Sequence, residues 1–251
     1  MKKNVLISGA SSGLGAGMAR EFAKRGDNLA LCARRLDRLQ GVRDEIHALQ
    51  PQVEVSIHAL DVTDHAQVFS TFHAVRERFG TLDRVVVNAG IGQGVPIGKG
   101  DFARNKAIVE TNLIAALAQC EGAMEIFRAQ NYGHLVVMSS ISAMRGQRSG
   151  LTAYAASKAG VAALAEGIRA DMLRKPGIKV TTLFPGYIRT EMNEHADPKH
   201  TRYIIDGERG ARLLVEAIER ERAKAYVPWW PWAPLGYLMK RMPLSWVAKL
   251  A

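Results

Sequence analysis

A doubly wound α/β fold is predicted for this chain of 251 residues, with a seven-stranded parallel sheet in a single domain. Three observations predict it. Short, almost continuously apolar segments alternate with longer helical stretches, which is typical of parallel strands buried on both faces. A glycine-rich turn follows the first of these segments, and no Gly/Ser/Pro-rich linker interrupts residues 1–228. Because crossovers between parallel strands are right-handed, this alternation places helices on both faces of the sheet.

The hydrophobic pattern gives the expected elements in chain order. Strands are expected at residues 4–8, 28–33, 53–60, 84–90, 134–140, 179–186 and 225–228. Helices are expected between them, at residues 14–25, 36–49, 64–79, 104–129, 151–174 and 206–222. The domain is therefore expected to occupy residues 1–228. Residues 229–251 form an apolar tail rich in tryptophan and proline.

Composition and charge limit the classes of function. The formal net charge of +10 favours phosphate-bearing ligands, an anionic membrane or nucleic acid. No basic block is interleaved with aromatic residues and no zinc-finger or helix-turn-helix spacing occurs, so nucleic-acid binding is not expected. Cys32 and Cys120 lie far apart in apolar segments, which is typical of reduced core thiols and gives no metal site. The start of the chain lacks a secretory signal pattern, and a cytoplasmic location is expected.

The glycine turn after the first strand predicts a nucleotide site of the Rossmann type. In "SGASSGLG" (8–15), glycines permit a tight turn and let the backbone approach a pyrophosphate. The helix that begins near Leu14 would direct free amide groups at the anion. The residues expected to hold it are Gly9, Ser11, Ser12, Gly13, Leu14 and Gly15. The alternative is a glycine turn that binds no ligand.

The end of the second strand, "CARR", favours NADP(H) over NAD(H). Ala33 stands where an NAD site usually has an acid that binds the ribose hydroxyls. The following Arg34 and Arg35 suit a 2′-phosphate, because a guanidinium can donate two hydrogen bonds to it. The alternative is a surface arginine pair at the start of a helix.

The stretch "LTAYAASKAG" (151–160) places a phenol and an ammonium on one helical face, since Tyr154 and Lys158 are four residues apart. The small residues around them leave room for a ligand and for close helix packing. A nearby ammonium favours the phenolate, so a lowered pKa and a proton-exchanging Tyr154 are expected. Taken alone, the pair could equally be a chance feature of a solvated helix.

Seven motifs together resemble the short-chain dehydrogenase/reductase family over about residues 4–228. They occur in the family's order: "SGASSGLG" (8–15), "LDV" (60–62), "NAG" (88–90), "ETNLIA" (110–115), "VVMSS" (136–140), "YAASK" (154–158) and "FPGYIRT" (184–190). Each is weak by itself, and all seven in sequence are specific. Ser8 departs from the family, where threonine is more usual at this position.

The resemblance implies hydride transfer between a nicotinamide and a carbonyl or alcohol carbon, in a dimer or tetramer. It implies that Tyr154 is the general acid/base, that Lys158 binds the nicotinamide ribose, that Ser140 holds the substrate oxygen and that Asn112 holds a water. Further cofactor contacts are implied for Asp61, Val62, Asn88, Ala89, Gly90, Tyr154, Lys158, Pro185, Gly186, Ile188 and Thr190. Substrate contacts are expected from Ser140, Ser142, Tyr154, Tyr187 and Met192.

Two points stay open beside the resemblance. One more residue separates Ser140 from Tyr154 than is common in the family, so Ser142 is an alternative to Ser140. The run 189–205 is interpreted as a lid over the substrate.

The tail, 229–251, carries all four tryptophans and three basic residues but no acid. Its uncharged run is too short to span a bilayer, and its prolines predict short helical pieces. Tryptophan with basic residues suits peripheral contact with a membrane, here the inner face. The alternatives are that the tail caps the substrate pocket or packs on a partner subunit.

These features predict an NADP(H)-dependent oxidoreductase that acts on a lipophilic ketone or secondary alcohol. Aldehydes and 3-oxoacyl thioesters are alternative substrates. Two other classes are a non-catalytic NADP(H)-binding sensor or scaffold and a membrane-tethering module.

Overall fold

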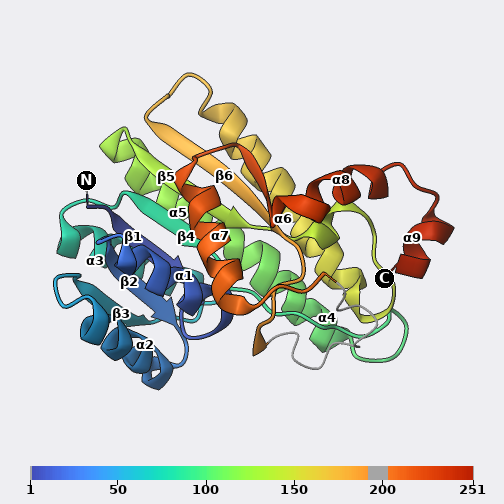
Figure 1. The fold of residues 1–251 in the computed structure, drawn as a ribbon, viewed down its shortest axis with the longest axis horizontal. Coiled ribbons are helices and arrows are strands. Elements are labelled where there is room, and N and C mark those ends of the chain that lie inside the picture. The colour runs from blue at the N-terminus through green and yellow to red at the C-terminus, as the bar shows by residue number, and fades with distance from the viewer. Residues whose placement is uncertain (1, 192–202, 251) are drawn as a thin grey trace.

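A parallel sheet of seven strands forms the centre of the computed structural model, which describes residues 2–191 and 203–250 (Figure 1). Across these residues the strand order is β3-β2-β1-β4-β5-β6-β7, and every paired strand is parallel. The strands are β1 Asn4–Ser8, β2 Asn28–Ala33, β3 Val55–Ala59, β4 Arg84–Val87, β5 Gly133–Met138, β6 Ile178–Pro185 and β7 Lys224–Val227. The order reverses between β1 and β4, which creates a crevice at the carboxyl ends of these strands.

Helices cover both faces of the sheet, as the alternation of apolar segments predicts. The helices are α1 Gly13–Lys24, α2 Leu36–Leu49, α3 His65–Phe79, α4 Phe102–Val109, α5 Ala115–Gln130, α6 Thr152–Asp171, α7 Gly207–Glu219, α8 Trp229–Met239 and α9 Leu244–Leu250. Apolar side chains of α1, α2 and α7 pack in one core cluster, and those of α3, α5 and α6 pack in a second cluster on the opposite face. The predicted doubly wound fold is therefore confirmed.

Among the differences from the sequence prediction, two concern segments beside the crevice. Strand β4 ends at Val87 rather than at residue 90, since the Asn88 side chain donates to the backbone oxygen of Ser8 at 2.8 Å. The single helix expected over 104–129 is divided by a π-helical turn, Glu110–Ile114, between α4 and α5. Such turns often occur at functional sites, and this one contains Asn112.

The two cysteines are core thiols, as expected. Cys32 and Cys120 are free and buried, and burial raises the pKa of each thiol to about 12. Both are therefore neutral and unreactive at physiological pH.

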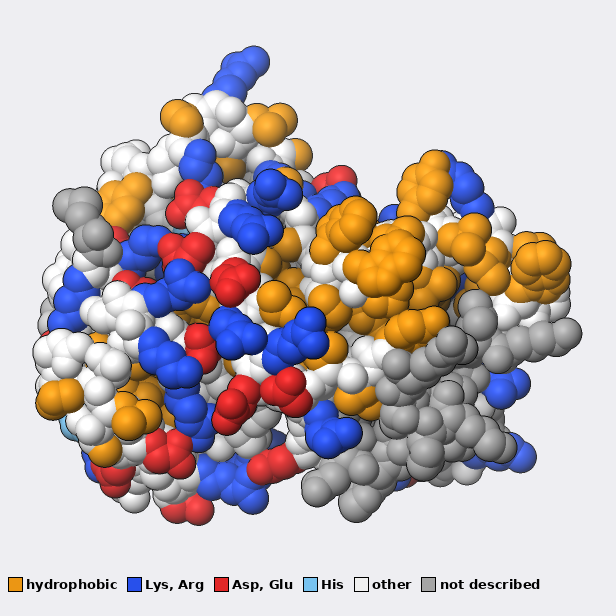
Figure 2. Space-filling model, viewed as in Figure 1, with side chains coloured by type: hydrophobic (Ala, Val, Ile, Leu, Met, Phe, Trp, Pro, Cys, Tyr) orange, Lys and Arg blue, Asp and Glu red, His pale blue; other side chains and the backbone are white. Residues whose placement is uncertain are grey.

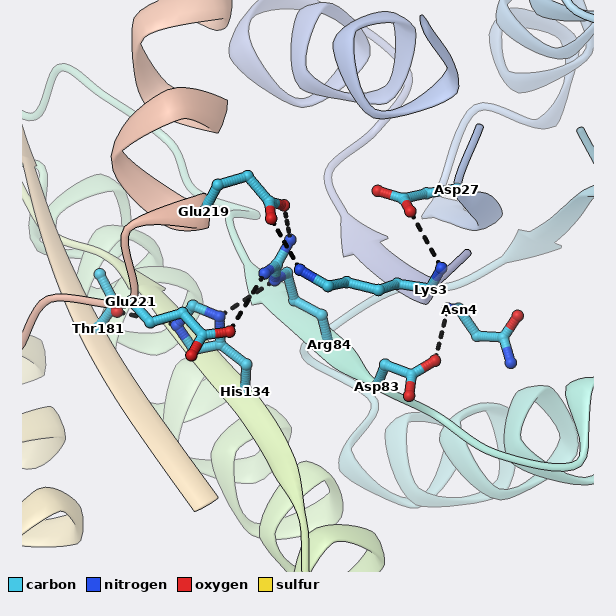
Figure 3. Close-up of polar contacts among 9 residues, drawn as sticks. All are labelled: Lys3, Asn4, Asp27, Asp83, Arg84, His134, Thr181, Glu219 and Glu221. Atoms are coloured by element: carbon cyan, nitrogen blue, oxygen red, sulfur yellow. Dashed lines mark hydrogen bonds and ion pairs between the residues drawn. The ribbon is translucent and has the colours of Figure 1, made fainter. Parts of the chain in front are cut away.

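A buried polar network lies at the amino-terminal ends of the central strands (Figure 3). The sequence did not predict it. Arg84, at the start of β4, is only 1% exposed and pairs with Glu219 at the end of α7. Lys3 Nζ donates to the same carboxylate at 2.7 Å, and Arg84 Nε donates to His134 Nδ1 at 3.1 Å. Since His134 Nδ1 accepts, its Nε2 carries the proton and donates to Thr181 Oγ1 at 2.8 Å. The network thus ties β1, β4, β5, β6 and α7 together.

The network makes the fold sensitive to acid. Burial and the nearby Arg84 lower the pKa of His134 to about 3, so the folded protein keeps this histidine neutral while the unfolded chain binds a proton below about pH 6.5. Burial opposes ionisation of Glu219, but hydrogen bonds from Arg84 and Lys3 outweigh it and lower its pKa to about 2. Both groups therefore stabilise the fold at neutral pH, and this stability is lost as the pH falls.

The expected result is a free energy of unfolding that falls by about 1.4 kcal/mol per pH unit between pH 6 and pH 4 through His134 alone. Urea unfolding at several pH values measures it. His134→Gln keeps one acceptor and one donor but cannot bind this proton, so its slope should be shallower by that amount. The exposed His65→Gln serves as the matched control and should retain the wild-type slope. Equal slopes for both variants would contradict the assignment.

Candidate active site

A cleft of about 1030 Å³ opens at the carboxyl ends of the strands, at the point where the strand order reverses. It gathers residues that are far apart in sequence. The predicted residues that line it are Gly9, Ser11, Ser12, Gly13, Leu14, Gly15, Arg34, Arg35, Asp61, Val62, Asn88, Ala89, Gly90, Ser140, Ser142, Tyr154, Lys158, Pro185, Gly186, Tyr187, Ile188 and Thr190. Asn112 lies behind the cleft wall, and Met192 and most of the expected lid fall outside the described residues.

The glycine loop between β1 and α1 has the geometry of an anion cradle. Gly9 has φ of 65°, and a Cβ there would lie 2.9 Å from the Ala89 Cα, so only glycine fits. A Cβ on Gly15 would lie 2.2 Å from the backbone oxygen of Gly9. Helix α1 begins at Gly13 without a side-chain cap from Ser12, so the amide groups of its first turn remain available to a ligand. The loop therefore fits the pyrophosphate of a dinucleotide.

The two predicted arginines lie at the same end of the cleft. Arg35 Nη2 donates to Ser12 Oγ at 2.9 Å, which holds the guanidinium beside the glycine loop. The Asp61 carboxylate accepts from the Thr63 backbone amide, which lowers the pKa of Asp61, and the positive charge of Arg34 adds to this lowering. This end of the cleft thus presents two cations and one ionised carboxylate.

Tyr154 and Lys158 lie on successive turns of α6 at the other end. Lys158 Nζ lies 5.9 Å from the centre of the Tyr154 ring and donates to the backbone oxygen of Met138 at 2.8 Å. Ser139 Oγ donates to the backbone oxygen of Lys158 at 2.8 Å, which fixes α6 against the end of β5. Burial lowers the pKa of Lys158 to about 8, so its charge is retained at neutral pH but is easily lost above it.

The pKa of Tyr154 differs from the sequence expectation. Burial raises it, a hydrogen bond with Ser140 acts in the opposite direction, and the neighbouring Tyr187 raises it further. The protein's own groups act in the opposite direction from the expected lowering, because desolvation of the phenol is the largest effect and the Lys158 ammonium is directed to the Met138 backbone oxygen. Tyr154 is therefore a neutral phenol, the form that can give a proton.

The hydrogen bond to Tyr154 distinguishes the two candidate serines. It is made by Ser140, whose Oγ also accepts from the backbone amide of Ser142 at 3.1 Å. Ser142 lines the cleft one turn further on, in a 3₁₀ turn at Ile141–Met144. The geometry therefore places Ser140 beside the phenol.

The Asn112 side chain is bonded to the loop that follows β4. Its Oδ1 accepts from the backbone amide of Ile91 at 2.8 Å, and its Nδ2 donates to the Ile91 oxygen at 2.9 Å. A Cβ on Gly90 would lie 3.0 Å from Asn112 Oδ1 and 3.5 Å from Lys158 Nζ, so the asparagine lies close to the lysine. Its side chain fixes the loop that follows β4, and this loop forms one wall of the cleft.

The tail contributes to the site in a way that the motifs did not indicate. Trp232 of α8 is 4% exposed and lies against Gly186, where a Cβ would be 2.1 Å from the indole Nε1. Its ring meets the edge of Tyr187, with ring centres 5.3 Å apart. Helix α8 therefore supports the cleft wall from behind. In the sequence, the glycine at position 186 was the only sign that another group comes close to the backbone there. No sequence pattern shows that this group is Trp232.

Comparison with known proteins places the chain among oxidoreductases. The family model described as short chain dehydrogenase matches residues 3–201. An uncharacterized oxidoreductase of Mycobacterium tuberculosis is 49% identical over 96% of this chain and 94% of its own length. The human protein named short-chain dehydrogenase/reductase 3 is 30% identical over 91% of this chain and 76% of its own length.

Solved structures agree with this placement. A levodione reductase superposes with a TM-score of 0.81 at 28% identity, covering 89% of this chain and 94% of the other. An alcohol dehydrogenase from the archaeon Thermococcus sibiricus, complexed with 5-hydroxy-NADP, has a TM-score of 0.78 at 27% identity and covers 90% of this chain and 96% of the other.

Proposed function

Because the chain belongs to the short-chain dehydrogenase family, a family of oxidoreductases that use a nicotinamide cofactor, we propose that it reduces or oxidises a lipophilic carbonyl or secondary alcohol with NADP(H). The observation that carries this proposal is the cluster of Ser140, Tyr154 and Lys158 at one end of a cleft whose other end is a glycine cradle. A non-catalytic binding protein has no need of a proton donor in this place.

The nicotinamide supplies the hydride, and the chain supplies the proton and the orientation. Tyr154, held neutral by burial, gives its proton to the substrate oxygen as the carbonyl carbon is reduced. Ser140 donates a hydrogen bond to the same oxygen and keeps it beside the phenol. The phenolate that results is stabilised by the Lys158 ammonium one helical turn away. In the oxidative direction the same groups act in reverse.

Preference for NADP(H) follows from the charge at the adenosine end. Arg34 and Arg35 line the cleft where β2 ends, and Ala33 places no carboxylate at that strand end, so the Asp61 carboxylate after β3 is outnumbered by the two cations. Binding of an NADP derivative by the archaeal alcohol dehydrogenase supports this choice.

Replacing Arg34 and Arg35 together with Ala is expected to raise the Kd for NADPH roughly 30-fold or more, because charge-assisted hydrogen bonds to the 2′-phosphate are lost. The Kd for NADH should change by less than about threefold. Titration of cofactor fluorescence measures both constants. Arg76→Ala, an exposed arginine outside the cleft, is the control and should leave both unchanged. An equal loss for the two cofactors would reject the phosphate role.

A lipophilic substrate fits the apolar wall near Tyr154. Ile91, Ile141, Leu151 and Tyr187 line this end of the cleft, and Trp232 supports it from behind. The test is NADPH consumption over ketones of graded chain length and ring size, with aldehydes and 3-oxoacyl thioesters included. Turnover that rises with apolar size supports the proposal. Tight NADPH binding without turnover of any carbonyl would favour a sensor or scaffold instead.

A further inference from the structure

The two tail helices present a contiguous apolar surface beside the substrate end of the cleft (Figure 2). We call it the tail surface and define it by its large exposed side chains: Trp229, Trp230, Tyr237, Leu238, Leu244 and Trp246. Each is between 53% and 69% exposed, although each is large and apolar or amphipathic. Exposed apolar patches of this kind mark sites that contact another phase or molecule.

All the charged side chains of the tail are basic. Residues 229–251 contain no Asp or Glu, while Lys240 and Arg241 join the two helices. The Arg241 guanidinium lies over the ring of Tyr237, 3.9 Å from its centre, so cation and aromatic side chain share one edge of the surface. In Figure 2, orange side chains dominate this part of the molecule and basic ones flank them, whereas acidic and basic side chains are mixed over the neighbouring face.

The opposite side of the tail is fixed to the cleft. Trp232 and Met239 are buried, and Gly236 lies against Ile141 and Met144. Arg145 donates to the backbone oxygens of Lys240 and Met242, each at 3.4 Å, which holds the turn between α8 and α9. The tail surface therefore has a set orientation relative to the loop that carries Ser140 and Ser142.

We propose that the tail surface binds the interface of an anionic lipid bilayer. Tryptophan and tyrosine rings combine an apolar body with a polar edge and favour the level of the lipid headgroups. Lysine and arginine at the rim are attracted to anionic headgroups, and a net charge of +10 adds to this attraction. An apolar protein partner would leave Lys240 and Arg241 without counter-charges, whereas an anionic membrane supplies them. None of the described helices is long and apolar enough to cross a membrane.

The experiment is co-sedimentation of the full-length protein with vesicles of phosphatidylcholine alone and with added phosphatidylglycerol. Binding is expected to the vesicles that contain phosphatidylglycerol and to weaken as salt is raised. Lys240→Glu with Arg241→Glu should lower the partition coefficient at least ~30-fold. The matched control is Arg174→Glu with Lys175→Glu, a neighbouring exposed basic pair at the far end of α6, which should retain most of the binding.

A second pair of variants tests the apolar contribution. Trp230→Ser with Trp246→Ser should weaken vesicle binding, while Leu49→Ser with Leu173→Ser, which removes equally exposed side chains elsewhere, should not. The Kd for NADPH is measured for every variant to show that the fold is intact. Wild-type protein that ignores the anionic vesicles, or equal losses in test and control variants, would overturn the proposal. A third result would also overturn it: the wild-type protein does not bind vesicles, and Trp230→Ser with Trp246→Ser dissociates an oligomer. The tail surface would then be a subunit interface.

Discussion

Tyr154→Phe is expected to lower kcat by about 10²- to 10⁴-fold, because it removes the hydroxyl that gives the proton and leaves the ring in place. The Kd for NADPH should stay within about threefold of the wild-type value, since the phenylalanine ring fills the same half-buried site on α6. Steady-state assay of the best carbonyl from the screen gives kcat, and cofactor titration gives the Kd. A large fall in kcat with an unchanged Kd for NADPH identifies a catalytic rather than a structural tyrosine.

Tyr132→Phe is the matched control for this experiment. Tyr132 is 38% exposed before β5 and lies outside the cleft, so its variant should keep wild-type kcat. Full activity of Tyr154→Phe would remove the proton donor from the proposed mechanism. A parallel loss of NADPH affinity would instead show that the phenol supports the cleft rather than the chemistry.

The fold could be predicted because its causes are local in sequence. Strands of a parallel sheet are apolar on both faces, so β1, β2, β5 and β6 stand out as short apolar runs between amphipathic helices. The glycine loop was visible for a similar reason. A backbone at φ of 65° beside the Ala89 Cα excludes every side chain at Gly9, and this constraint leaves a direct mark on the sequence.

The sequence predictions differ from the structure in the direction of the Tyr154 pKa shift, in the end of β4 and in the helix expected over 104–129. Spacing placed Lys158 one turn from Tyr154, but spacing does not show that Lys158 is buried and Tyr154 half-buried. Desolvation then decides the direction of both pKa shifts. The contacts that Asn88 and Asn112 make with Ser8 and Ile91 likewise join segments far apart in the chain, which composition does not reveal.

The two features that sequence analysis missed are both contacts over long distances along the chain. Trp232 meets Gly186 from 46 residues away, and Glu219 meets Arg84 from 135 residues away. The sequence analysis places Arg84 at the start of the strand expected over residues 84–90 and gives no partner for its charge. Only the sheet order, which brings β4 between β1 and β5, gathers its partners.

Arg84→Met is expected to lower the free energy of unfolding by about 3 kcal/mol, the lower end of the range found when one partner of a buried ion pair is removed, because Glu219 is 25% exposed. Methionine fills much of the same volume beside Phe22, so little cavity forms. The loss of stability then measures the loss of the polar contacts of Arg84. Without Arg84, His134 Nδ1 has lost its donor and Glu219 keeps only Lys3. Urea unfolding measures the change. None of the network residues lines the cleft, which lies at the opposite, carboxyl ends of the strands, so kcat should stay within about twofold of wild type.

Arg78→Met provides the matched control for Arg84→Met. Arg78 pairs with Glu54 at 2.9 Å, but both side chains are about half exposed, so its loss should change stability by less than about 1 kcal/mol. If burial of the charges causes the difference, adding Glu219→Gln to Arg84→Met should cost less than Glu219→Gln costs the wild-type protein, because the carboxylate no longer has its main partner. Additive losses in this double-mutant cycle, or similar losses for Arg78 and Arg84, would show that the buried pair does not stabilise the fold as a unit.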